Sequence, residues 1–347
     1  MSVVLSAFAQ TWEPFVLILG LLMIGQVAAT DGLFEFVGAR LASLPGGGVT
    51  LLVMMMALVA VVTATLNLDT SVVFLTPILL HAARRRGIED RPFLYGSIFM
   101  ANSASLLLLG SNLTNILVFA GRHVRGAAFS RAMFPAWVTS VALTTVIIVI
   151  WCWRDLHDPR MVKDRDVASM NSVVGLVALV AATVVMLVMG NPALGVLAIG
   201  VAAQAISLIR SRRFDLAQVL GVLNLPLLAC LFALALVVAI VAREWDYPQH
   251  LMANAGPWTS AAIGAGSANV INNLPAAALL SSKLPRHPYA LLFGLDLGPN
   301  LTVLGAMSSL LWLRIARKNG ARPSVRTFSR IGVVITLSTL VAALVVS

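Results

Sequence analysis

Long apolar runs separated by short basic loops make up most of this sequence. Eight runs are long enough to cross a hydrocarbon core of about 30 Å as helices, and they cover residues 12–30, 93–120, 133–153, 171–190, 193–210, 223–243, 288–315 and 329–347. Apolar residues make up 59% of the chain and charged residues 11%, whereas soluble domains carry about 25% charged residues. The pattern predicts an all-α polytopic membrane protein with about eight full crossings.

Two further apolar regions are interrupted by polar residues. Residues 49–66 end at Asn67-Leu68-Asp69-Thr70, and residues 257–271 end at Asn272-Asn273-Leu274-Pro275. In each region the apolar segment that follows the polar residues is short, and in the first region it has only about ten apolar residues. A segment of that length is too short to span a bilayer. The sequence therefore predicts two re-entrant hairpins, at residues 49–80 and 257–282, whose polar tips face protein or a water-filled cavity inside the membrane.

The distribution of basic residues predicts the orientation of the chain. If the N-terminus lies outside and each hairpin returns to its side of entry, 18 of the 24 Lys and Arg residues fall in loops on one side. Cytoplasmic loops carry such an excess. We therefore expect a multi-pass protein of a bacterial-type inner membrane, and we interpret the net charge of +10 as this bias and not as a nucleic-acid surface.

The chain divides into two similar units and a connection. Residues 1–153 and 223–347 repeat one order of predicted elements: spanning helix, amphipathic segment, hairpin, broken helix and helix. Residues 154–222 supply a connecting loop and two scaffold helices. The first unit starts outside and the second inside, so the repeats are inverted, which is typical of a secondary transporter with its site between the repeats.

Each unit also contains the hexamer Leu-Gly-x-Asn-Leu-Thr, within the helices predicted at 93–120 and 288–315. Because Gly and short polar residues interrupt strongly apolar sequence, we expect both helices to be broken there, at residues 110–115 and 298–302. The repetition indicates that each unit contributes half of one site.

Two of the fourteen acidic residues, Asp69 and Asp296, lie deep within apolar sequence. A carboxylate at the centre of a membrane helix costs about 2.5–3.5 kcal/mol on insertion scales, so an isolated one is a candidate functional group. We predict that both carry protons. A helix cap at Asp69 and a hydrogen-bonded strut at Asp296 are alternative roles, compatible with the first.

Uncharged polar residues gather at the same four breaks. A single membrane Asn usually joins two helices, but this many at the predicted breaks indicate a site for a small oxygen-bearing solute. The predicted substrate- and ion-binding residues are Asn67, Asp69, Thr70, Ser111, Asn112, Thr114, Asn115, Asn272, Asn273, Asp296, Asn300 and Thr302. We predict no metal and no cofactor, because the histidines have no paired spacing and no P-loop motif is present.

Several segments resemble the arsenical pump membrane proteins, the ArsB-type arsenite permeases of the ion transporter superfamily. They are SASLLLLGSNLTNILV at 103–118, SANVINNLPAAALL at 267–280 and GLDLGPNLTVLGAMSSLLWL at 294–313, with LDTSVVFLTPI at 68–78 and DGLFEFVGARL at 31–41. The resemblance runs from about Trp12 to the C-terminus. It implies an inverted-repeat fold with scaffold and transport parts, often dimeric, and export of arsenite or antimonite in exchange for protons. Some relatives work with a cytosolic ATPase partner.

The sequence departs from that family at three places. The first tip has Leu68-Asp69-Thr70 where the permeases have Asn-Asp-Gly, and Asn300 stands where they carry Lys. The family also has two further N-terminal helices, and nothing before Trp12 matches residues 171–210. Either the first scaffold is reduced or the chain begins further upstream.

Three functions agree with these features to different degrees. Proton-coupled export of arsenite or antimonite fits best, because neutral trihydroxy arsenite suits uncharged polar groups. A sodium-coupled carboxylate or oxyanion transporter, or a sodium–proton antiporter, is the alternative within the superfamily. An aspartyl protease using Asp69 and Asp296 lacks the Gly-x-Gly-Asp pattern. We therefore expect a transporter and not an enzyme, whose partners are a small inorganic solute, a coupling proton or sodium ion and the lipid bilayer, without nucleic acid.

Overall fold

The computed structural model describes residues 3–120, 124–156, 169–211, 245–283 and 285–347, together with Ala233 and Val237. Every regular element within these ranges is a helix, which confirms the all-α prediction. The predicted run at 223–243 lies outside the described residues, apart from those two.

Five helices in the described part are long and apolar enough to cross a membrane. They are α1 (Val3–Thr30, of which Trp12–Thr30 qualifies), α3 (Gly48–Thr65), α7 (Gly126–Trp151), α9 (Ala193–Ser211) and α17 (Val325–Val346). The prediction of eight differs because two of its runs are broken helices, one lies outside the described residues, and α8 (Val174–Val188) is shorter. By length α3 is itself able to span, although we predicted it as a hairpin arm.

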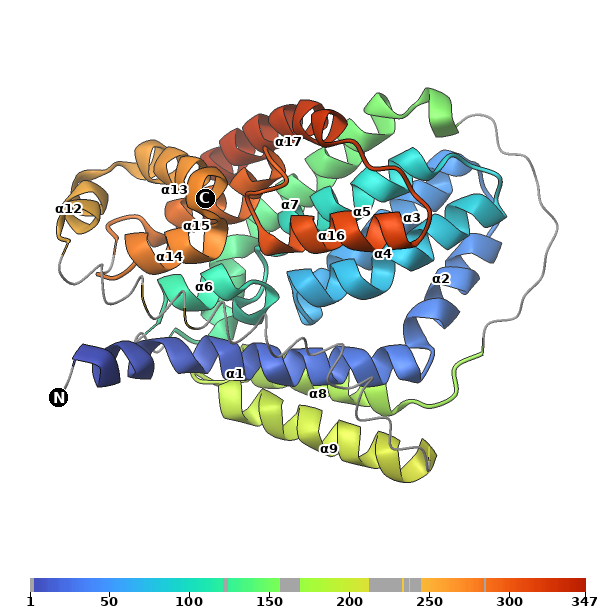
Figure 1. The fold of residues 1–347 in the computed structure, drawn as a ribbon, viewed down its shortest axis with the longest axis horizontal. Coiled ribbons are helices and arrows are strands. Elements are labelled where there is room, and N and C mark those ends of the chain that lie inside the picture. The colour runs from blue at the N-terminus through green and yellow to red at the C-terminus, as the bar shows by residue number, and fades with distance from the viewer. Residues whose placement is uncertain are drawn as a thin grey trace.

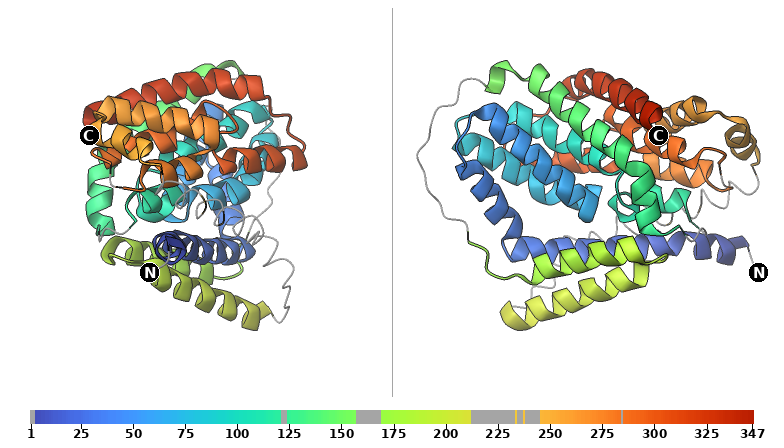
Figure 2. Two further views of the ribbon diagram at one scale, coloured as in Figure 1. Left: turned by 60° about the vertical axis from the view of Figure 1, so that its left-hand side comes forward. Right: turned by 180° about the vertical axis from the view of Figure 1, so that it is seen from behind.

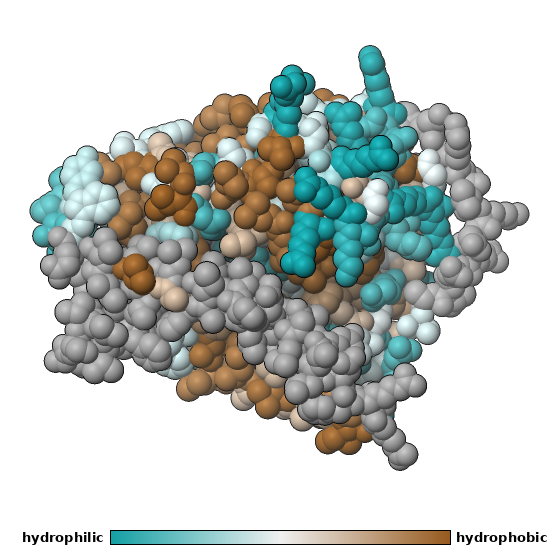
Figure 3. All heavy atoms as spheres, viewed as in Figure 1, coloured by the Kyte–Doolittle hydropathy of each residue, from teal (hydrophilic) through white to brown (hydrophobic). Residues whose placement is uncertain are grey.

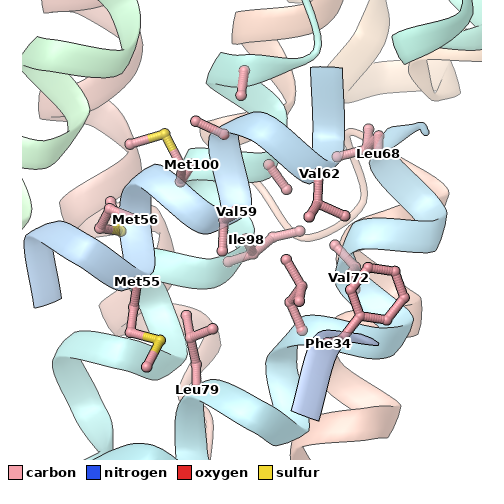
Figure 4. Close-up of a cluster of buried hydrophobic side chains, with 14 of the residues drawn as sticks. Phe34, Met55, Met56, Val59, Val62, Leu68, Val72, Leu79, Ile98 and Met100 are labelled. Carbon is pink, nitrogen blue, oxygen red and sulfur yellow. The ribbon is translucent and has the colours of Figure 1, made fainter. Parts of the chain in front are cut away.

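The first predicted hairpin is formed by α3 and α4 (Leu68–Arg85), joined only by Leu66 and Asn67. Figure 4 shows Val62 and Leu68 near the turn, with Met55 and Leu79 toward the other end of the pair. The prediction of a short second arm was wrong. Helix α4 has 18 residues in all, because it continues past its apolar residues into the basic end. Basic residues in its last turn, Arg84 and Arg85, favour this extension by interacting with the helix dipole.

The first broken helix consists of α5 (Asp90–Ala104), the short 3-10 turn η1 (Leu109–Ser111) and α6 (Leu113–Val118). The break begins at Ser105, earlier than the predicted Gly110, and Asn115 lies inside α6. Side chains explain this boundary: Trp137 Nε1 donates to Ala104 O at 3.1 Å, and Asn115 Nδ2 donates to Ser105 O at 2.9 Å. Carbonyl groups freed by the break are thus paired with protein donors.

The second unit follows the same order after residue 245. Its described elements are α12 (Tyr247–Asn254), α13 (Pro257–Ile271), α14 (Asn273–Leu280), α15 (Pro288–Leu297), η3 (Gly298–Asn300), α16 (Met307–Lys318) and α17. The break here runs on to Ala306, beyond the predicted Thr302. The two hexamers are therefore not equivalent. The first hexamer lies at the end of its break and runs into α6, whereas the second lies at the start of its break and follows α15.

The helices form two groups that are joined by α2 (Leu33–Ser43). Helices α1, α8 and α9 pack together along one side of the molecule, and α2 leads from the end of α1 to the remaining helices (Figures 1 and 2). A buried apolar cluster fills the space between α2, α3, α4 and α5, with Phe34, Met56, Val72 and Ile98 among its members (Figure 4). This packing holds the turn between α3 and α4 in place.

Helix α17 approaches the backbone of the second break without an intervening side chain. A Cβ atom at Gly332 would lie 1.7 Å from Asn300 O, so only glycine permits this contact. By contrast, Gly266 on α13 is exposed and has no atom within 4 Å of its Cβ position. Small residues at such crossings let membrane helices pack closely.

We expect Gly332→Ala to lower the thermal stability of the purified protein. The added methyl group must displace α17 or η3, and overpacking of this kind typically costs about 1–3 kcal/mol. Gly266→Ala is the matched control, since it adds the same methyl group to a helix with open space. Thermal unfolding monitored by fluorescence-detected size exclusion measures both, and equal melting temperatures for the two variants would contradict the prediction.

Candidate substrate and ion site

The four predicted breaks meet at one small cavity of about 20 Å³. Its lining comes from the starts of four helices, namely Leu68 and Asp69 of α4, Asn112 and Leu113 at α6, Asn272, Asn273 and Leu274 at α14, and Ala306, Met307 and Ser308 at α16. Residues more than two hundred positions apart in the sequence therefore surround one space.

Three predicted Asn residues cap three of the four helices that start at this cavity, namely α4, α6 and α14. Asn67 Oδ1 accepts a hydrogen bond from Thr70 N at 2.7 Å, Asn112 Oδ1 from Thr114 N at 3.4 Å, and Asn272 Oδ1 from Leu274 N at 3.4 Å. Helices α4, α14 and α16, which have eight or more residues, direct their positive dipole ends toward the same space.

The second tip is held against the second break by hydrogen bonds. Asn273 N donates to Gly305 O at 2.9 Å, and Asn272 Nδ2 donates to Leu304 O at 3.1 Å. Asn272 has φ 75 and ψ 150, a backbone conformation that is rarely adopted by residues other than glycine. Such strain persists where surrounding contacts hold the chain, often at ligand sites.

Asp69 lines the cavity and is half-buried. Its carboxylate makes no hydrogen bond or ion pair with another described residue. The alternative role as the cap of α4 was wrong, because Asn67 occupies the cap position and Asp69 lies in the first turn. The carboxylate is therefore available to whatever enters the cavity.

Asp296 lies behind the cavity wall and is only 1% exposed. Its Oδ1 accepts hydrogen bonds from Asn112 Nδ2 at 3.0 Å and from the Thr114 hydroxyl, while its Oδ2 has no hydrogen-bond partner in the described part of the chain. The role of a hydrogen-bonded strut is confirmed, since these bonds join α15 to α6. The side chain of Asn112 separates Asp296 from the cavity.

Three predicted site residues support the structure and do not line the cavity. Ser111 donates to Leu108 O at 2.6 Å, and Asn115 Nδ2 donates to the same oxygen at 3.1 Å. Thr70 packs its methyl group close to Gly25 of α1. These residues hold the first break and the first tip in shape.

The remaining predicted residues, Asn300 and Thr302, lie in a second layer of polar contacts. Asn102 Nδ2 donates to Asn300 Oδ1 at 2.8 Å, and the Thr302 hydroxyl donates to Asn269 Oδ1 at 2.7 Å. Sequence reasoning missed Asn102 and Asn269, and also Ser308 in the cavity wall. The available signal was proximity, because Asn102 precedes the first break by three residues and Asn269 precedes Asn272 by three.

Comparison with known proteins identifies the family. A family model described as citrate transporter matches residues 1–292, which is most of the chain. The chain belongs to the ArsB/CitMHS ion transporter superfamily. A second model of this superfamily, described as arsenical pump membrane protein, matches residues 262–347 of the transporter.

Two relatives illustrate the similarity over the full length. The arsenical pump membrane protein of Escherichia coli (strain K12) is 24% identical over 370 residues, covering 96% of this transporter and 85% of the relative. An uncharacterised transporter of Mycobacterium tuberculosis (strain ATCC 25618 / H37Rv) is 25% identical over 369 residues, with the same coverage. The resemblance found in the sequence is confirmed.

A solved structure shows the same fold. The crystal structure of the Alcanivorax borkumensis YdaH transporter, reported as having an unusual topology, matches with a TM-score of 0.63 and 14% identity, over 99% of this transporter and 86% of that chain. This match shows the fold, whereas the family models show that the protein is a multi-pass secondary transporter of this superfamily, since both describe transporters and not enzymes. The aspartyl protease hypothesis is excluded.

Proposed function

We propose that this transporter exports arsenite or antimonite across the inner membrane in exchange for protons. The observation that carries the proposal is the composition of the cavity wall, in which Asp69 is joined by Asn, Ser and backbone groups and no basic side chain is present among the described lining residues. Trihydroxy arsenite is neutral and offers hydroxyl groups to such a wall. The similarity to arsenical pump membrane proteins supports this substrate.

The sequence predicts that both Asp69 and Asp296 carry protons, whereas in this proposal the two carboxyl groups have different roles. Asp69 contacts the solute, because it lies in the cavity. Asp296 exchanges the coupling proton. Asn112 and Thr114 donate hydrogen bonds to Asp296 Oδ1, and through them the protonation state of Asp296 affects the cavity wall. A buried carboxyl group without a fixed cationic partner takes up a proton more readily than an exposed one.

The cavity volume defines what must move. A space of about 20 Å³ holds roughly one water molecule, so solute entry requires the tips and the half-helices to separate. We propose that the two units are inverted repeats with re-entrant hairpins, with the N-terminus outside. The transport part moves against the scaffold of α1, α8 and α9 to expose the site alternately. The homodimer and the cytosolic ATPase partner implied by the resemblance belong to the same proposal.

A second candidate is a sodium-coupled carboxylate or oxyanion transporter. Two observations favour it: three helix N-termini that face the cavity suit a negative charge, and the citrate transporter model matches residues 1–292. A sodium–proton antiporter would use the same carboxyl groups without an organic solute. The sodium-coupled transporter differs from arsenite export in the ion that drives transport, and the sodium–proton antiporter differs in the species that is exchanged for protons.

We expect everted membrane vesicles that contain this protein to accumulate radiolabelled arsenite when a pH gradient is imposed without sodium. Export from the cell corresponds to uptake in this orientation, and a protonophore should abolish the accumulation. Vesicles from cells without the gene are the control. If folded protein accumulates citrate or another oxyanion only with sodium, and no arsenite, the second candidate replaces the first.

A further inference from the structure

A ring of buried polar side chains joins the two units next to the candidate substrate site. Asn102 Nδ2 donates to Asn300 Oδ1 at 2.8 Å. Asn112 Nδ2 donates to Asp296 Oδ1 at 3.0 Å and to Ser105 Oγ at 3.3 Å. The Ser105 hydroxyl in turn donates to Asn102 O at 2.8 Å. All five residues are at most 6% exposed, and the ring closes through the backbone between Asp296 and Asn300, about one helical turn apart.

The two asparagines of the repeated hexamer both reach across to the other unit. Asn112 and Asn300 hold the same position in Leu-Gly-x-Asn-Leu-Thr, at residues 109–114 and 297–302. Asn112 of the first unit bonds to Asp296 of the second, and Asn300 of the second unit bonds to Asn102 of the first. In each unit the hexamer therefore supplies one crossing to the broken helix of the other unit.

The two crossings differ in their response to a proton. The carboxyl group of Asp296 is a strong acceptor for Asn112 and Thr114 when it is ionised, and a weaker one when it carries a proton. The bond between Asn102 and Asn300 joins two neutral amides, which do not titrate. Uptake of a proton therefore weakens the crossing at Asp296 and leaves the crossing at Asn102 unchanged.

No charged side chain in the described part of the chain bonds to Asp296. Helix α15 packs against α5, α6, α13, α14, α17 and η3. The titratable residues of these elements and of α15 itself are Tyr289, Asp90, Arg91, Tyr95, Arg326 and Arg330. Tyr289 lies seven positions before Asp296, or about 10 Å along the helix. Asp90 and Arg91 take part in salt bridges, Tyr95 is hydrogen-bonded at its hydroxyl group, and the two α17 residues are exposed. Figure 3 shows hydrophilic side chains on the surface where α16 ends and α17 begins.

Both partners in the Asn102 crossing are firmly held. Asn102 lies in α5, whose residues Pro92–Ala104 are all buried. On the other side, a Cβ atom at Gly332 would lie 1.7 Å from Asn300 O, so α17 supports this segment directly. The Asn112 crossing instead joins α15 to the residue between η1 and α6, where the chain is not helical. One crossing is thus rigidly supported and the other is attached to the break.

A single hydrogen bond joins the two amides of the supported crossing. The other acceptor and donor, Asn102 Oδ1 and Asn300 Nδ2, are buried and have no hydrogen-bond partner in the described part of the chain. Two amides that exchange both bonds are fixed in one plane, whereas one bond permits rotation about its axis. Because an unpaired buried group costs free energy, a rotation that gives either group a partner is favoured.

We propose that Asn102 is a positioning residue for transport: its bond to Asn300 is the fixed point about which the two broken helices turn, while the bonds at Asp296 open when that carboxyl group takes up a proton. This role rests on the proton exchange by Asp296 in the proposed function. It does not depend on the identity of the solute, since neither Asn102 nor Asn300 lines the cavity. Asn102 keeps the two units in register while the Asp296 bonds are open.

Hydrogen–deuterium exchange of the full-length protein in detergent micelles tests this role without any solute. The reporters are the backbone amides of residues 301 and 305, which donate to carbonyl oxygens within the second break at 3.0 Å. Rates are corrected for the intrinsic effect of pH and measured at the acid and alkaline ends of the range in which the protein stays folded. We expect Asn102→Ala to raise exchange about tenfold at the acid end, where the Asp296 bonds are open, and less than about twofold at the alkaline end.

Three further variants separate this role from a simple loss of stability. Thr144→Val is the matched control, because it removes a buried hydrogen bond of 2.8 Å to Ser103 that joins α5 to α7 within the first unit; it should change exchange equally at both ends. Adding Asp296→Asn to Asn102→Ala should extend the increase to the alkaline end, since an amide at Asp296 is neutral at every pH. Asn300→Ala removes the same bond from the other side and should reproduce the pattern of Asn102→Ala. Size-exclusion profiles establish which variants are folded.

The pH pattern decides between a positioning role and a structural one. Equal increases at both ends in Asn102→Ala would overturn the proposal, as would an increase no larger than that of Thr144→Val. If Asn102→Ala leaves exchange unchanged while Asp296→Asn loses proton-driven accumulation, the positioning role fails and the proposed proton role stands. An increase that stays confined to the acid end after Asp296→Asn is added would show that another group titrates, which would overturn the link to Asp296.

Discussion

Asp296→Asn is expected to reduce proton-driven arsenite accumulation to the background of empty vesicles, while exchange of labelled for unlabelled arsenite continues. The amide keeps an oxygen for the hydrogen bonds from Asn112 and Thr114, so the link between α15 and α6 is retained. It carries no exchangeable carboxyl proton, so coupling is lost. Accumulation and exchange, measured in the same vesicle preparation, separate the proton from the solute.

The stability of this variant needs its own measurement. The new amide nitrogen takes the place of Asp296 Oδ2, which has no described hydrogen-bond partner, and an unsatisfied buried donor costs about 1–3 kcal/mol. Glu89→Gln, the same type of change at an exposed residue, is the control. Proton-driven accumulation at the wild-type rate in folded Asp296→Asn protein would remove Asp296 from the coupling mechanism.

Asp69→Asn is expected to weaken arsenite binding by about tenfold or more, so that exchange and accumulation both decline. Asp69 lines the cavity, and hydrogen bonds to a charged carboxylate contribute about 1.5–3 kcal/mol, which corresponds to a factor of roughly 10–150 in affinity. The dependence of the exchange rate on arsenite concentration measures the effect. The contrast with Asp296→Asn, in which exchange survives, distinguishes a solute contact from a proton carrier.

Asp246→Asn provides the control for this substitution. Asp246 pairs with Lys283 at 3.4 Å, but both side chains are exposed, 61% and 72% respectively, so the pair contributes little. If Asp69→Asn exchanges arsenite with the affinity of the Asp246→Asn control, Asp69 is not a solute ligand, and the proposed division of roles between the two carboxyl groups is wrong.

Local sequence was sufficient to locate the polar breaks but not to define their boundaries. Asn67 and Asn112 lie between helices, as predicted, since short polar residues within apolar runs disrupt membrane helices unless they have partners. The first break nevertheless begins at Ser105, because the donors that permit it, Trp137 and Asn115, come from a different helix and from beyond the break. The length of α4 was missed because helix continues through its basic end, beyond the apolar residues.

The site residues show the same division. Both intramembrane carboxyl groups were found from sequence, because charge inside an apolar run is rare and costly whatever the fold. The different positions of these two carboxyl groups relative to the cavity could not be predicted from sequence, since Asp296 lies behind Asn112, a residue 184 positions away. Asn102 was missed because its partner, Asn300, is 198 positions away.

By itself, the sequence determined that this is an all-helical membrane transporter with polar breaks and two carboxyl groups within apolar runs, since apolar length, charge placement and motifs are properties of neighbouring residues in the chain. Only the tertiary structure decided that Asp69 faces the cavity while Asp296 is hydrogen-bonded behind it, and that Asn102 bonds to Asn300. The direction of a side chain depends on how separate helices pack, and that packing is set by contacts between residues far apart in the chain.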